Sequence, residues 1–158
     1  MAELDDLIAD ISPLVKGAPK PVMQRELRDA ARDFFARSGI WRERLPVVQA
    51  KDGWNQYEFN HPFGAEVKYL TRDRYGQQAF YGERRLVQGT LEQFFDYEQT
   101  DGSKREPSYF VLEGNRNFRV WPTPGADQET DGKDFVFYAI LRPSRNTDEI
   151  PDWLVDEY

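Results

Sequence analysis

The sequence predicts an α+β fold, with helices near the chain ends and an antiparallel β domain of about six strands between them. Three observations indicate this fold class. Apolar residues recur at helical spacing over the first 37 residues. Short runs rich in Val and aromatic residues, separated by Gly, Asn and Pro, follow over residues 45–143. A further helix start lies at residues 149–154.

Two helices are predicted in the amino-terminal part, residues 1–44. The first has apolar residues at i, i+3, i+4 and i+7, and Pro13 ends it near Ser12. Pro21 opens a longer helix that runs to about Arg37, where Gly39 suits the stop. Its apolar stripe consists of Met23, Leu27, Ala30, Ala31 and Phe34. We expect one helical cluster made of Leu7, Ile11, Leu27, Phe34, Trp153 and Leu154.

The β domain is predicted to span residues 45–143. Residues 45–50 and 54–59 form a hairpin around Asp52 and Gly53, and residues 66–70 form a third strand. Thr90 and Gln93 have the spacing of a capping box, which predicts a short helix over residues 90–97. Residues 108–113 and 118–121 flank a Gly/Asn turn. Residues 135–141 are apolar on both faces, as in a central strand.

The carboxyl-terminal segment, residues 144–158, leaves the β domain through a loop and starts a helix near Pro151. A helix of two turns is too short to be stable alone. We therefore expect either that it packs back on the amino-terminal helices or that the natural chain continues beyond Tyr158.

Charge is concentrated at the two ends of a chain whose net charge is −7. Residues 1–12 carry four acids and no base, and residues 126–158 carry nine acids and three bases. The excess of +3 between them is too slight for a nucleic-acid surface. We expect the acidic ends to share an environment or a partner. The chain begins with acids and has no long apolar run, so we expect a cytosolic protein, or part of a particle assembled there, with no membrane contact.

Sequence signatures of catalysis are absent. The chain has no Cys and one His, which excludes disulfides, Cys-based metal sites and multi-His sites. No phosphate-binding loop, dinucleotide fingerprint, nucleophile elbow or EF-hand is present. His61 follows Asn60 and precedes Pro62, so we expect a loop residue rather than a general base. Asp29 and Asp33 share a helix face, but bases at ion-pair spacing make it a solvated face: Arg25, Arg32 and Arg37. We predict a protein that is not an enzyme, with no cofactor and no metal.

Basic and aromatic residues alternate in one segment, residues 72–85. Such a segment could bind a single nucleic-acid strand, but Asp73 and Glu83 dilute its charge and favour a protein partner. The four Trp residues are expected to be core or interface anchors. The predicted interface residues are Trp41, Arg42, Arg72, Arg74, Tyr75, Trp153 and Tyr158.

Three stretches occur together in a recognisable order. The first reads ELRDAARDFF at residues 26–35 and runs into IWRE at 40–43. The second is YFVLEG at 109–114 followed by FRVWPTP at 118–124. The third is LRPSR at 141–145 leading to IPDWL at 150–154. Their order and spacing resemble the head-to-tail adaptor, or connector, proteins of tailed bacteriophages, including the tail tubular protein A type of short-tailed phages.

The resemblance implies a structural protein of the virion neck, assembled in the host cytoplasm. It implies a helical bundle formed by the chain ends that carries an inserted β domain. Such proteins form a homo-oligomeric ring, usually of twelve copies, which binds the portal protein above and a tail or nozzle protein below. Genomic DNA passes through the lumen without sequence-specific binding. Relatives usually continue past the IPDWL helix start into further helices.

The residues themselves leave two other functions open. One is a cytosolic β-rich binding module for a peptide or small ligand, and the other is an unrecognised hydrolase. Ring formation with a portal protein separates the adaptor from both, and loss of turnover on changing His61 would favour the hydrolase.

Overall fold

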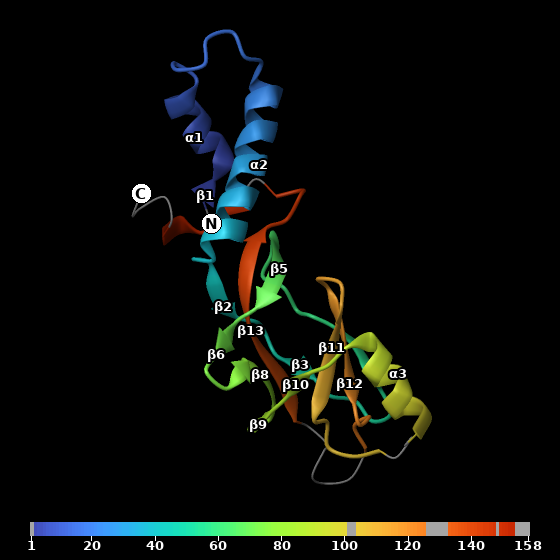
Figure 1. The fold of residues 1–158 in the computed structure, drawn as a ribbon. Helices are drawn as coiled ribbons and strands as arrows, with labels where there is room; N and C mark the ends of the chain where they lie inside the picture. The colour runs from blue at the N-terminus through green and yellow to red at the C-terminus, as the bar shows by residue number, and fades with distance from the viewer. Residues whose placement is uncertain (1, 101–103, 126–132, 148, 154–158) are drawn as a thin grey trace.

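The computed structural model of the protein describes residues 2–100, 104–125, 133–147 and 149–153. These ranges hold three helices and fourteen strands, so the fold is α+β. Helices α1 (Leu4–Ile11) and α2 (Lys20–Ser38) lie side by side and project from one end of the strands (Figure 1). Within the described ranges, none of the helices has the length and apolarity that crossing a membrane requires.

Both amino-terminal helices are confirmed close to their predicted ends. The backbone N–H of Ser12 donates to the carbonyl of Ile8 at 2.8 Å and closes the last turn of α1. Helix α2 starts directly after Pro19 and ends at Gly39. Gly39 adopts a left-handed conformation with φ of +60°, which lets its N–H donate to the carbonyl of Phe35 at 3.1 Å.

The predicted apolar stripe of α2 is wrong at its carboxyl end. Phe35 is 0% exposed and packs edge-on against Trp41 with 5.3 Å between ring centroids, whereas Phe34 is 48% exposed. Residues at i+7 and i+8 from Leu27 can both lie on one helix face. Helix α2 packs on the longest strand, residues 134–143. This contact buries Phe35 in the core and leaves Phe34 on the exposed side of the helix.

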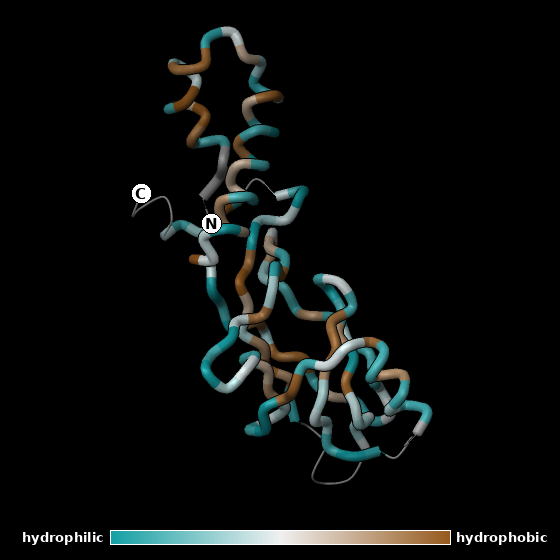
Figure 2. Tube along the Cα trace, in the orientation of Figure 1, coloured by the Kyte–Doolittle hydropathy of each residue, from teal (hydrophilic) through white to brown (hydrophobic). Residues whose placement is uncertain are grey.

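The expected helical cluster is only partly present. Leu7 and Leu27 are half-buried against the core, and Ile8 is buried between the helices. Trp153 is 40% exposed, so it is not a member, and Leu154 lies outside the described residues. Apolar residues nevertheless continue from the sheets into the helix pair (Figure 2).

The longest strand is β13 (Asp134–Pro143), and it organises the larger sheet. Its antiparallel partners are β2 (Arg42–Arg44), β3 (Val48–Gln49), β5 (Ala65–Leu70) and β8 (Ala79–Tyr81). Strand β9 (Arg84–Arg85) extends the sheet from β8. One face of β13 is fully buried, while the alternate residues Val136 and Tyr138 are half-buried. The prediction of a central strand is confirmed.

A second sheet has the order β10 (Val87–Gln88), β11 (Tyr109–Glu113), β12 (Asn117–Trp121) and β4 (Gln56–Glu58). The β11–β12 hairpin forms as predicted, whereas β10 pairs with β11 in parallel. The short helix is α3 (Leu91–Thr100). Its capping box is complete, because the N–H of Gln93 donates to Thr90 Oγ1 at 3.2 Å and the N–H of Thr90 donates to Gln93 Oε1 at 3.1 Å.

The predicted hairpin around Asp52 and Gly53 is wrong. The turn exists, but its two arms separate: β3 pairs with β13 and β4 pairs with β12. Tyr57 of β4 packs between Phe118 and Phe135, with ring centroids 5.5 and 4.9 Å away. Burial of these aromatic rings between the two sheets stabilises the separated arms more than a local hairpin could.

Several short strands were not predicted, among them β8, β9 and β10 of the two sheets and the strands of two further pairs. Strands β6 (Arg72–Asp73) and β7 (Gly76–Gln77) form a small hairpin. Strand β14 (Glu149–Ile150) pairs with β1 (Ala2–Glu3), where a helix start was expected, and the helical turn comes only at Asp152 and Trp153. Ile150 is buried in the core, which explains why this segment is extended. The polar and Gly-rich composition of residues 125–133 predicts a loop, and residues 126–132 of it lie outside the described residues.

Candidate interaction surface

The predicted interface residues lie in three different parts of the structure. Trp41 is 3% exposed and packs against Phe35, so it presents almost no surface to a partner. Arg42 follows it on the exposed strand β2, and its Nε donates to the carbonyl of Gly39 at 3.0 Å. Trp153 is partly exposed just after β14, and Tyr158 lies outside the described residues.

Arg72, Arg74 and Tyr75 come together on the β6–β7 hairpin. Tyr75 is 67% exposed at its tip. The guanidinium of Arg74 lies 4.6 Å from the centre of the Tyr75 ring, and that of Arg85 lies 5.9 Å from it. These cation–π contacts hold the aromatic ring at the surface. An exposed aromatic ring flanked by arginines is typical of residues that anchor protein interfaces.

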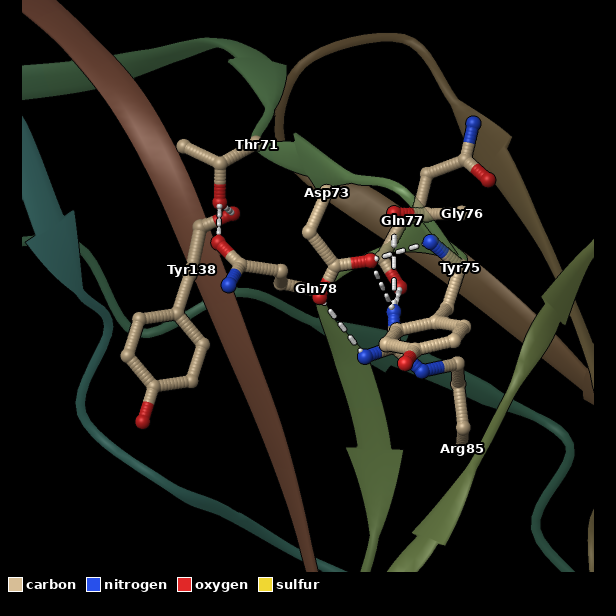
Figure 3. A network of polar contacts seen from close by, with 8 residues as sticks. All are labelled: Thr71, Asp73, Tyr75, Gly76, Gln77, Gln78, Arg85 and Tyr138. Carbon is tan, nitrogen blue, oxygen red and sulfur yellow. Dashed lines mark hydrogen bonds and ion pairs between the residues drawn. The ribbon is translucent and has the colours of Figure 1, made fainter.

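An ion pair fixes the conformation of this hairpin. Arg85 reaches across from β9 and binds both carboxylate oxygens of Asp73, with Nη1–Oδ1 at 3.1 Å and Nη2–Oδ2 at 2.8 Å (Figure 3). Its Nη1 also donates to the carbonyl of Gln77 at 2.9 Å. The hydrogen bonds from Arg85, and then the backbone N–H of Tyr75, lower the pKa of Asp73 below its ordinary value. Asp73 therefore positions Arg85 and the turn that carries Tyr75.

The base of the hairpin is tied to the central strand. Thr71 is buried, and its Oγ1 lies 2.6 Å from Oε1 of Gln78 and 3.0 Å from the carbonyl oxygen of Tyr138 (Figure 3). The backbone N–H of Tyr138 donates in turn to the carbonyl of Gln78 at 3.0 Å. The exposed tip is thus carried by a rigid base, as precise recognition requires.

A second surface was missed by sequence reasoning. It is a groove between α2, β5 and the end of β13, and we call it the basic groove. It is lined by Arg25, Arg28, Asp29, Arg32, Asp33, Ala36, Lys68, Arg142 and Arg145. Helical spacing predicts that arginines of α2 form ion pairs with Asp29 and Asp33. Among the predicted pairs of described residues, only Arg37 with Asp33 forms, with 2.9 Å between Nε and Oδ1. The remaining cations come from segments distant in the sequence, so no local signal could have grouped them.

Glu66 anchors the inner wall of the basic groove. Its Oε1 accepts from Nη2 of Arg32 at 2.8 Å and from Nε of Arg142 at 2.6 Å. Arg32 also donates to the carbonyl of Pro143. Burial alone would raise the pKa of Glu66, but the hydrogen bonds from the two arginines outweigh burial and lower it. The carboxylate is therefore ionised and holds two guanidinium groups in place.

His61 is half-buried just after β4 and is not among the residues that line the basic groove. Burial, and then the charge of Arg116, lower its pKa below the ordinary value, so the imidazole is neutral at pH 7. Its Nε2 is buried, and it makes no hydrogen bond with a carboxylate of the described residues. Its ring stacks on Phe59 with 6.3 Å between centroids. Within the same ranges, no group of three or more potential ligands is placed to hold a metal ion.

Comparison with known proteins identifies the family. The family model described as SU10 adaptor protein matches residues 2–158. That range includes both helices of the projecting pair, the two sheets and all three stretches noted in the sequence. No curated protein matches the chain. Because the family model covers nearly every residue, the chain belongs to the SU10 adaptor protein family.

Proposed function

We propose that this chain is a structural protein of the bacteriophage virion and acts as a head-to-tail adaptor. The match to the SU10 adaptor protein family over residues 2–158 is the observation that carries this proposal. The match agrees with the resemblance of the three stretches to phage adaptors, and it supports a role in assembly rather than catalysis. The narrower likeness to tail tubular protein A stays a prediction.

The proposed working form is a ring, of about twelve copies as the resemblance implies, beneath the portal. The ring binds the portal on one side and a tail or nozzle protein on the other, and genomic DNA passes through its lumen without sequence-specific contacts. The exposed β6–β7 hairpin supports such contacts, because it presents Tyr75 between arginines on a rigid base. We assign Arg72, Arg74 and Tyr75 to one of these two protein contacts.

We also propose a division of the chain into a helical part at residues 1–44, a β domain at 45–143 and a terminal segment at 144–158. The last segment completes a small helical bundle with α1 and α2. Pairing of β14 with β1 supports this, because it brings the end of the described chain beside the start of α1. An apolar groove between the two helices supports it as well, since Ile11, Val15 and Val22 line a surface that a further helix could cover.

Electron microscopy of the full chain mixed with the purified portal ring tests the proposal. We expect class averages in which a second ring of fixed symmetry caps the portal. The matched variant is Tyr75→Ala, which removes the exposed ring at the hairpin tip and is expected to weaken one of the two contacts without loss of folding. A chain that stays monomeric with the portal at low salt, and that is absent from purified virions, would refute the adaptor role.

One observation favours the alternative of a binding module. An open groove beside Trp54 is lined by β3 and β4, and Nζ of Lys51 lies 4.5 Å above the Trp54 ring. A peptide or small ligand could bind there. Saturable binding of a peptide that Trp54→Ala abolishes, together with no portal binding, would favour that function over the adaptor.

A further inference from the structure

The helix pair carries opposite charges on two flanks. The first flank is the basic groove, in which six cations and two acids meet. Glu66 is shared by Arg32 and Arg142, so one carboxylate neutralises two guanidinium groups. Lys68 and Arg145 form no ion pair with another described residue. The charges of Lys68 and Arg145 are therefore not neutralised by an ion pair within the described residues.

The second flank is acidic and belongs to α1. Asp6 and Asp10 are four residues apart, so they lie on one face of the helix, and both are exposed. Among the described residues, no base pairs with either of them. Asp5 differs, because it accepts from Gln24 at 2.9 Å and from Lys20 at 3.1 Å. Like charges at this spacing destabilise an isolated helix, which favours a cationic partner for Asp6 and Asp10.

The two flanks face different directions. Ile8 is buried against α2 near Leu27, and at about 100° per residue Asp6 and Asp10 point away from that contact. Arg32 lies five residues after Leu27, roughly 140° around α2. An acidic flank and a basic flank on different sides of one unit allow head-to-tail contacts, which close into a ring when the rotation between copies permits.

We propose that the acidic flank of one copy, Asp6 and Asp10, docks into the basic groove of the next copy. This inference rests on the proposed function, because it names the contact between neighbouring copies in the adaptor ring. Asp29 and Asp33 reduce the positive charge of the groove, so it suits an occupant with two carboxylates better than a DNA backbone with a charge on every phosphate. Complementary charge also sets the register and orientation of docking.

Two charge-reversal variants and their combination test the contact. The first is Asp6→Lys with Asp10→Lys, and the second is Lys68→Glu with Arg145→Glu. Circular dichroism checks that each variant is folded, and size-exclusion chromatography with light scattering measures the ring fraction with the portal in about 0.05 M salt, where surface charges are weakly screened. The matched control for the first variant is Glu92→Lys with Glu98→Lys, which raises the net charge by the same amount at exposed acids of α3.

Each reversal is expected to lower the ring fraction at least about tenfold, because like charges then face each other, and the combination is expected to restore it. The control is expected to leave rings intact. Rings that persist in both reversals, or a combination that fails to restore them, would overturn the contact while the adaptor role stands. Loss of DNA retention in the Lys68 and Arg145 variant with unchanged rings would assign the basic groove to phosphate and also overturn it. A wild-type chain that forms no ring with the portal would overturn the proposed function itself.

Discussion

Replacing Phe35 by alanine is expected to destabilise the protein far more than the same change at Phe34. The Phe35 ring is 0% exposed and lies 5.3 Å from Trp41, so its removal leaves a cavity between α2 and the sheet. Truncation of a buried Phe costs about 3 to 5 kcal/mol. Phe34 is 48% exposed, and alanine has the higher helix propensity, so Phe34→Ala costs about 1 kcal/mol at most.

Urea unfolding followed by far-UV circular dichroism measures both changes. This signal avoids the fluorescence of Trp41, which the loss of its neighbour would alter directly. With a urea dependence of about 2 kcal/mol per molar, the midpoint of Phe35→Ala falls by roughly 1.5 to 2.5 M and that of Phe34→Ala by less than about 0.5 M. Equal shifts, or a larger shift for Phe34→Ala, would refute the packing of α2 described above.

Three further predictions follow from the other contacts. Because arginine hydrogen bonds lower the pKa of Glu66, its contribution to stability is complete above about pH 4.3 and is lost as the pH falls below that value. Urea titrations of Glu66→Gln in acid should lack this part of the pH dependence, and an unchanged acid limb would contradict it. Thr90→Ala removes the cap that the Gln93 N–H uses and should cost about 1 kcal/mol, while Thr90→Ser retains most of it; equal losses in the two variants would count against the capping role. His61→Ala should leave virion assembly and infectivity unchanged, and a folded variant with lost infectivity would argue for a chemical role of the imidazole.

Local signals in the sequence were sufficient for several elements. The spacing of apolar residues and the positions of Pro13, Pro21 and Gly39 predict α1 and α2, and the spacing of Thr90 and Gln93 predicts α3. A Gly/Asn turn between two aromatic-rich runs predicts the β11–β12 hairpin. In each case the residues that decide the structure lie within a few positions of one another, so the chain needs no distant partner to specify it.

The two candidate surfaces differ in how far the sequence predicts them. Arg72, Arg74 and Tyr75 are neighbours in the sequence, and their alternation indicated an exposed recognition segment. The basic groove joins α2 to Lys68 and to Arg142 and Arg145, and no spacing rule relates those segments. The sequence analysis assigned the arginines of α2 to ion pairs with Asp29 and Asp33, because the i,i+4 rule relates only residues of the same helix.

Helical periodicity, helix caps and tight turns are predictable from the sequence, because each depends on residues that are close together in the chain. The packing of distant segments determines which of Phe34 and Phe35 is buried, which strands the arms around Gly53 join, and that Ile150 pairs in a strand. Those outcomes depend on which apolar faces meet when sheets and helices pack together. Burial of large side chains between distant segments contributes more free energy than any local preference, so it selects among conformations that the local sequence permits equally.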